Sequence, residues 1–143
     1  MSKITKLLVV PMIAASYAAP TQVSADQLNS VSCSIIVDVT KPGGTEAYEK
    51  NFVIQQEADF FDDFSTATRI KEFSASTLTA SGKTNVTINY FNDVGVFDAL
   101  EFSTTYTLPR GKEAGSVSGR SAAYTSNGNF TADYTLTCKQ AKL

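Results

Sequence analysis

The residues best suited to chemistry lie in one acidic and aromatic stretch, EADFFDDFST, which runs from Glu57 to Thr66. Three of its carboxylates, Asp59, Asp62 and Asp63, are hard oxygen donors of the kind that bind calcium. Their spacing does not match the D-x-[DN]-x-[DN]-G calcium loop, and no glycine follows to form its sharp turn. The stretch therefore matches no standard metal loop, although an ion contact at these three carboxylates stays open.

Carboxylates could also serve as the acid pair of a glycosidase, which needs two carboxyl groups facing each other about 5 to 10 Å apart. Neighbours along one chain seldom adopt this arrangement, and nothing in the sequence singles out a partner such as Asp98 or Glu101. The chain has no histidine, the usual general base near neutral pH, and neither glycine-rich phosphate-binding motif. We therefore predict no enzyme activity, no metal and no cofactor, and keep a carboxylate-based glycosidase as a minor alternative.

The phenylalanines of the stretch favour a structural role. Phe60, Phe61 and Phe64 follow the i, i+1, i+4 spacing of a helical turn. We expect this turn to close one end of the core, with the aspartates facing water. The alternative is an exposed loop in which Phe61 and the neighbouring aspartates contact a partner, because exposed aromatic residues often mark interfaces.

The two cysteines, Cys33 and Cys138, lie near opposite ends of the mature chain. In an exported protein such a pair is usually a disulfide, and no CxxC motif indicates redox or metal chemistry. A bridge that closes a loop of about 100 residues stabilises a fold by roughly 4 to 5 kcal/mol in the chain-entropy model. We therefore predict a Cys33–Cys138 disulfide.

The N-terminal segment has the form of a secretory signal peptide. Lys3 and Lys6 precede the apolar run 7–19, and small residues follow at a suitable cleavage site. The run is shorter than the roughly 20 apolar residues of a membrane-spanning helix. We predict that residues 1–25 are cleaved, which leaves residues 26–143 as one exported domain that is periplasmic or secreted.

The distribution of charge argues against two classes of partner. The chain has 12 basic and 14 acidic residues, a net charge of -2, and the basic residues are scattered along it. Binding to nucleic acid or to an anionic membrane surface needs clustered lysine and arginine. We therefore expect neither partner, and we expect no insertion into a membrane.

Alternation of apolar and polar residues predicts an all-β domain. Strands are expected at residues 31–39, 48–56, 69–80, 84–91, 97–108, 117–125 and 130–139. Turns are expected at 41–45, 81–83 and 92–95. Asn127-Gly128, between the last two runs, is a strong hairpin signal.

These elements predict a single antiparallel domain of seven or eight strands, because short turns join neighbouring antiparallel strands. Both cysteines fall on the apolar faces of their strands, so the disulfide should join the first strand to the last. In a meander this contact closes the sheet and removes its edges. We favour an up-and-down barrel or a flattened β-sandwich derived from one, and a Greek-key sandwich stays open.

The sequence as a whole predicts an exported, soluble module that binds a protein or a cell-envelope component. Because function concentrates on loops, we expect the acidic stretch, the loop 109–115 and the turn 127–128 to meet at one end of the fold. The alternative is a small-ligand carrier with an apolar interior left partly empty by Gly119, Ala122 and Ala132. An outer-membrane barrel is a minor alternative, because it would share the signal peptide and the alternation.

Overall fold

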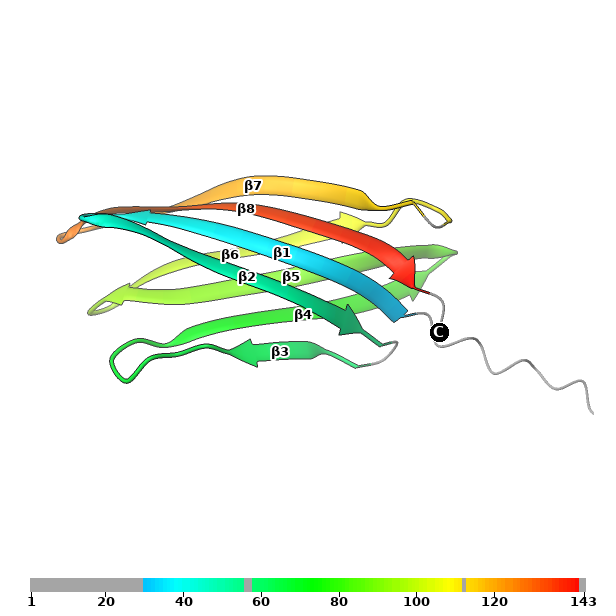
Figure 1. Cartoon of the computed structure of the whole chain (residues 1–143), viewed down its shortest axis with the longest axis horizontal. Coiled ribbons are helices and arrows are strands. Elements are labelled where there is room, and N and C mark those ends of the chain that lie inside the picture. The colour runs from blue at the N-terminus through cyan, green and yellow to red at the C-terminus, as the bar shows by residue number, and fades with distance from the viewer. Residues whose placement is uncertain (1–29, 56–57, 112, 142–143) are drawn as a thin grey trace, which may run out of the picture.

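Two antiparallel sheets of four strands each pack face to face (Figure 1). The computed structural model describes residues 30–55, 58–111 and 113–141, so the predicted signal peptide, residues 1–25, lies outside it. The sheet orders are β2-β1-β8-β7 and β3-β4-β5-β6. The strands are β1 (Ser30–Lys41), β2 (Gly44–Ile54), β3 (Phe60–Asp63), β4 (Lys71–Ala80), β5 (Lys83–Gly95), β6 (Asp98–Thr107), β7 (Gly115–Thr125) and β8 (Gly128–Ala141).

The strands follow one another up and down the sandwich in sequence order. We call the two boundaries where consecutive strands belong to different sheets, β2/β3 and β6/β7, the seams. The chain changes sheet only between β2 and β3 and between β6 and β7, while β1 pairs with β8 inside the first sheet. The prediction of an antiparallel all-β fold, flattened into a sandwich, is confirmed. The expectation that closure would remove the sheet edges is wrong, because β2, β3, β6 and β7 are edge strands along the two seams.

The predicted disulfide joins Cys33 of β1 to Cys138 of β8. The two residues face each other in the ladder, with their Cα atoms 4.2 Å apart, and both are buried. The bridge thus ties the first strand to the last, as predicted, and it indicates an oxidising environment such as the periplasm or the cell exterior. Within the described residues, no helix has both the length and the apolar character needed to cross a bilayer.

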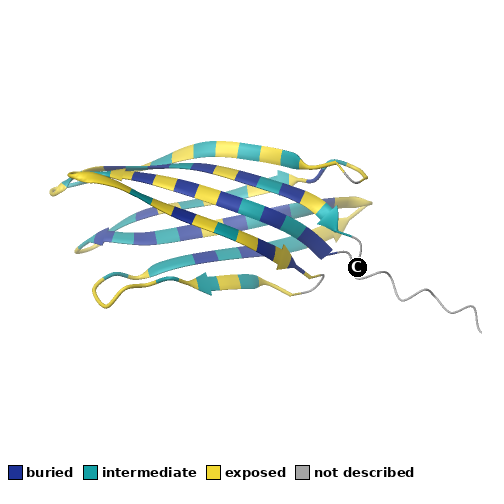
Figure 2. Ribbon diagram, viewed as in Figure 1, coloured by how far each residue is buried: buried dark blue, intermediate teal, exposed yellow. Residues whose placement is uncertain are grey.

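The core lies between the two sheets and follows the period-two pattern of the sequence. Buried and exposed residues alternate along the strands (Figure 2). Val31, Ile35 and Val37 of β1 and Val86 and Ile88 of β5 are fully buried. Because successive side chains of a strand point to opposite faces, the same pattern leaves one outward row of side chains on every strand.

Aromatic side chains fill much of the space between the sheets. The ring of Phe102 stacks on Tyr134, with 4.1 Å between centroids, and on Tyr90, with 5.1 Å. Gly119 of β7 admits the Tyr134 ring, since a Cβ at this position would collide with the tyrosine hydroxyl. Ala122 is exposed and does not face the interior. The small residue at position 119 therefore makes room for a tyrosine ring rather than for a ligand.

The turn between β5 and β6 lies farther along the chain than predicted. Residues 92–95 belong to β5, and the turn is formed by residues 96–97. Asn92 stays in the strand because its side chain is buried and donates hydrogen bonds to Glu46 Oε1, at 3.0 Å, and to Tyr90 Oη, at 3.2 Å. These tertiary contacts override the turn-like composition of the segment.

Candidate functional site

The acidic stretch contains a short edge strand rather than the helical turn that we predicted. Phe60–Asp63 forms β3 and pairs with β4, so its side chains alternate between the two faces. Phe60 and Phe64 pack against the core, whereas the Phe61 side chain points outward and is 60% exposed. The i, i+4 spacing of Phe60 and Phe64 is equally compatible with one face of a strand, and pairing with β4 decides between the two. Glu57 lies outside the described residues.

Asp62 bridges the seam between β2 and β3. The Tyr48 hydroxyl donates a hydrogen bond to Asp62 Oδ2 at 2.7 Å, and Lys50 Nζ lies 3.2 Å from the same carboxylate. Burial and this hydrogen bond raise the pKa of Tyr48 well above its ordinary value. The Tyr48 ring also stacks on Phe64, with 4.2 Å between centroids. The Asp62 carboxylate is therefore engaged in holding the two sheets together.

The other two aspartates of the stretch do not converge on Asp62. The Asp63 carboxylate accepts a hydrogen bond from the Ser65 backbone amide at 3.0 Å, and its contacts with Ser65 lower the pKa of Asp63. Asp59 is exposed ahead of β3. Asp62 and Asp63 also point to opposite faces of the strand. Among the residues that the structure describes, no three acidic, histidine or cysteine side chains are grouped so that they could hold a metal ion.

A second carboxylate links strands on the same side of the sandwich. It was not predicted from the sequence. Glu46 of β2 accepts hydrogen bonds from Lys41 Nζ at 2.9 Å, and from Lys71 Nζ and Asn92 Nδ2 at 3.0 Å each. Burial raises the pKa of Glu46, but these three donors outweigh it and lower the pKa to about 2. The donors come from three different strands, so no local spacing in the sequence could have indicated the cluster.

The seam between β6 and β7 has its own polar bridges. Ser121 Oγ donates a hydrogen bond to the Glu101 backbone carbonyl at 2.7 Å. Thr104 Oγ1 and the Tyr134 hydroxyl are 2.6 Å apart, which joins β6 to β8 across the core. Side-chain hydrogen bonds thus link the two sheets along both seams.

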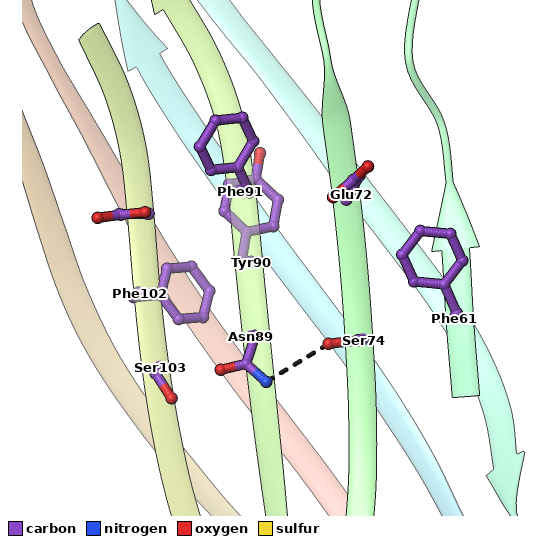
Figure 3. Close-up of a pocket in the computed structure, with 9 residues that line it drawn as sticks. Phe61, Glu72, Ser74, Asn89, Tyr90, Phe91, Phe102 and Ser103 are labelled. Atoms are coloured by element: carbon purple, nitrogen blue, oxygen red, sulfur yellow. Dashed lines mark hydrogen bonds between the residues drawn. The ribbon is translucent and has the colours of Figure 1, made fainter. Parts of the chain in front are cut away.

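An open groove of about 460 Å³ crosses the outer face of the β3-β4-β5-β6 sheet (Figure 3). This volume falls in the range of about 300 to 1,000 Å³ that is typical of ligand sites. Outward-facing residues of all four strands line it. They are Phe61 of β3, Glu72 and Ser74 of β4, Asn89 and Phe91 of β5, and Glu101 and Ser103 of β6.

One row of the groove is a line of hydrogen-bonding side chains that ends on an aromatic ring. Strand register places Phe61 opposite Ser74, Ser74 opposite Asn89, and Asn89 opposite Ser103. Asn89 Nδ2 donates a hydrogen bond to Ser74 Oγ at 3.4 Å (Figure 3). The amide oxygen of Asn89 and the Ser103 hydroxyl make no side-chain hydrogen bond within the described residues, so they can pair with a ligand.

The second row places an aromatic ring between two carboxylates. Phe91 lies opposite Glu72 on one side and opposite Glu101 on the other. Because neighbouring strands are about 4.8 Å apart, the backbones that carry the two glutamates are about 10 Å apart. Neither of the two carboxylates forms an ion pair or accepts a hydrogen bond within the described ranges. This row therefore presents negative charge on both sides of an apolar surface.

Of the residues that line the groove, only Phe61 was predicted from the sequence as a possible contact. Phe91 carried a signal, because alternation places it at an outward position where a polar side chain is expected. Glu72 and Glu101 carried none, since only the pairing of β4, β5 and β6 brings them beside that ring.

The loops expected to meet at one end of the fold lie at two ends. In Figure 1 the described residues between β6 and β7, 108–111 and 113–114, lie at the right-hand end, and the turn 126–127 lies at the left-hand end. Strands that run the length of the sandwich send alternate connections to opposite ends. This places the 109–115 loop away from the 127–128 turn, and β3 lies along an edge between the ends.

No protein-family model matches this chain, and no curated protein is similar to it in sequence. The function of the groove has to be inferred from the side chains that line it.

Proposed function

We propose that this protein is an exported, soluble, non-enzymatic module that binds a protein or cell-envelope partner on the outer face of its β3-β4-β5-β6 sheet. The observation that carries the proposal is the open groove, in which Phe61 and Phe91 stand at outward positions beside hydrogen-bonding and acidic side chains. Aromatic residues are enriched where proteins contact partners. The signal-like segment at residues 1–25 and the disulfide support export.

The outer side chains of β7 and β8 make a contrast that supports this choice of surface. There, hydroxyl side chains satisfy one another, with Ser116 2.7 Å from Thr137 and Ser118 3.0 Å from Thr135. This face carries an ordinary solvated row of small residues. The groove instead combines exposed aromatic surface with carboxylates that have no partner among the described residues, and both features favour a ligand.

The positions of the carboxylates support a function without catalysis. A glycosidase needs two carboxyl groups that face one sugar bond from opposite sides. Asp62 is held by hydrogen bonds inside the fold. Glu72 and Glu101 stand on one face of the same sheet, on either side of Phe91, rather than on opposite walls of a cleft.

Site-specific photocrosslinking in the source cells tests the proposal. A photoreactive amino acid replaces Ser103 in the groove or, as the matched control, Thr135 on the outer face of the other sheet; both positions are exposed on a strand. We expect a discrete adduct after illumination with the Ser103 substitution and none with the Thr135 substitution. Equal adducts at both positions, adducts at Thr135 alone, or no adduct at either position would contradict the proposal.

A further inference from the structure

We infer that the groove binds an extended peptide segment of the partner in which a basic residue stands next to an apolar one. The inference rests on the proposed function and adds the chemistry of the ligand. The basic side chain lies over Phe91 between Glu72 and Glu101, and the apolar side chain contacts the exposed turn between β5 and β6.

The charge of this surface is negative. A second hollow, of about 430 Å³, adjoins the groove at Phe91 and is lined in part by Asp93 and Asp98. Asp93 faces outward like Glu72 and Glu101, which gives three carboxylates along one continuous surface, and no lysine or arginine of the described ranges lines either hollow. A surface lined by one sign of charge attracts ligands of the opposite sign.

The Phe91 ring between the two glutamates offers a face to a positive group. An ammonium or guanidinium group is attracted to the face of an aromatic ring within about 6 Å of its centroid. A cation over Phe91 would stand above the sheet, offset sideways by one strand spacing, about 4.8 Å, from each glutamate-bearing strand. Both carboxylates could therefore reach the same positive group, which no other outward row of this sheet offers among its described residues.

The surroundings favour a peptide over a small amine. The row from Phe61 to Ser103 runs beside the charged row, and the Asn89 amide can accept a hydrogen bond from a peptide backbone. In the turn between β5 and β6, which lines the second hollow, Val96 is 81% exposed and Phe97 is fully exposed with a φ of 65°. A non-glycine residue held at positive φ is uncommon and is found disproportionately at functional sites. A ligand that contacts the carboxylates, the Asn89 amide and the exposed turn needs a positive group, a backbone amide and an apolar side chain, and a peptide has all three.

Titration of the mature, disulfide-bonded protein with defined peptides tests the inference. The probes are a capped peptide containing Arg-Phe-Arg, the same peptide with Gln in place of both Arg, and spermine as a small amine. At low ionic strength we expect the Arg peptide to bind at least about ten-fold more tightly than the Gln peptide and than spermine. Comparable binding of the Arg and Gln peptides would overturn the charge requirement, and equal binding of spermine would overturn the peptide requirement.

Matched charge variants locate the contact. Glu72→Gln with Glu101→Gln removes two charges from the groove, and we expect the affinity for the Arg peptide to fall at least about ten-fold. Asp38→Asn with Glu49→Gln removes two exposed charges from the outer face of the other sheet and should leave the affinity within about two-fold. An equal loss in both double variants would overturn the inference, because it would reflect net charge alone. If no peptide binds, the inference is wrong, while an adduct at position 103 would leave the proposed function standing.

Discussion

At the scale of single residues, neighbours in the acidic stretch have opposite roles because a strand alternates its faces. Asp62 points to the seam and joins β2 to β3, whereas Phe61 points away and forms one end of the groove. Two residues of the stretch that looked most like a metal loop thus have different roles: Asp62 links the two sheets, and Phe61 forms part of the outer surface. The same rule explains why Phe91 lies outside although Tyr90, beside it, is buried.

Tyr48→Phe tests the brace at the seam. The substitution keeps the ring that stacks on Phe64 but removes the hydrogen bond to Asp62. We expect a loss of about 1.5 to 3 kcal/mol in the free energy of unfolding, as for a hydrogen bond to a charged group. Urea denaturation measures it, with Tyr124→Phe as the control, because Tyr124 is 79% exposed. Equal stability of the two variants would show that the bond does not hold the seam.

Gly119→Ala tests the close packing under β7. The added methyl group would collide with the Tyr134 ring, so either the ring or the strand has to move. Overpacking of this kind costs about 1 to 3 kcal/mol. We expect a lower melting temperature than in the wild type and little change in the exposed variant Ser118→Ala. An unchanged melting temperature for Gly119→Ala would mean that the interior has spare room, as the carrier hypothesis requires.

At the scale of elements, the sequence predicted the strands with unbroken alternation and missed features that depend on pairing. β1 and β8 were placed correctly because each buries one continuous apolar face, whereas β5 was recognised but predicted to end four residues too early. β3 was missed because four residues are too few to show a period, and pairing with β4 defines the strand. The groove could not be predicted for a related reason, since its two rows exist only once the register of four strands is set.

The hydrogen bonds that Glu46 accepts from Lys41, Lys71 and Asn92 make the free energy of unfolding depend on pH. The pKa of Glu46 is lowered from 4.5 to about 2 in the folded protein. A lowered pKa means stabilisation that is fully present above pH about 4.5 and is lost as the pH falls towards 2. Because the carboxylate is partly open to solvent, we expect this contribution to be only about 1 to 2 kcal/mol.

Glu46→Gln tests this dependence, because glutamine cannot carry the charge. We expect the difference in unfolding free energy between wild type and variant to be largest near pH 6 and to narrow towards pH 2.5. Urea denaturation at several pH values measures it, and other carboxylates contribute equally to both proteins. A difference that stays constant across this range would show that the charge of Glu46 is not what stabilises the fold.

At the scale of the whole molecule, the disulfide and the groove belong to different sheets. Cys33 and Cys138 lie in the central pair of the first sheet, and the groove crosses the outer face of the second. The first sheet therefore joins the first strand to the last, and the second presents the proposed binding surface. Side-chain hydrogen bonds link the two sheets at both seams.

Removal of the disulfide tests this division of roles. The bridge joins residues 105 positions apart, and its loss in Cys33→Ala with Cys138→Ala should cost up to about 4 to 5 kcal/mol by the chain-entropy model. We expect the fraction that remains folded in the cold to bind the Arg-Phe-Arg peptide as the wild type does. Denaturation curves and titration on the same preparation measure both properties. Full stability without the bridge, or folded protein that no longer binds the peptide, would contradict the division.

The most direct test of the central claim is a map of the amide signals that shift when the Arg-Phe-Arg peptide is added to isotope-labelled protein. We expect the shifts to concentrate on outward residues of β4, β5 and β6, with those of Asn89, Phe91 and Glu101 among the largest. Residues such as Thr135, on the outer face of the other sheet, should stay unmoved. Shifts centred on β1 and β8, or no shifts at all, would contradict the claim.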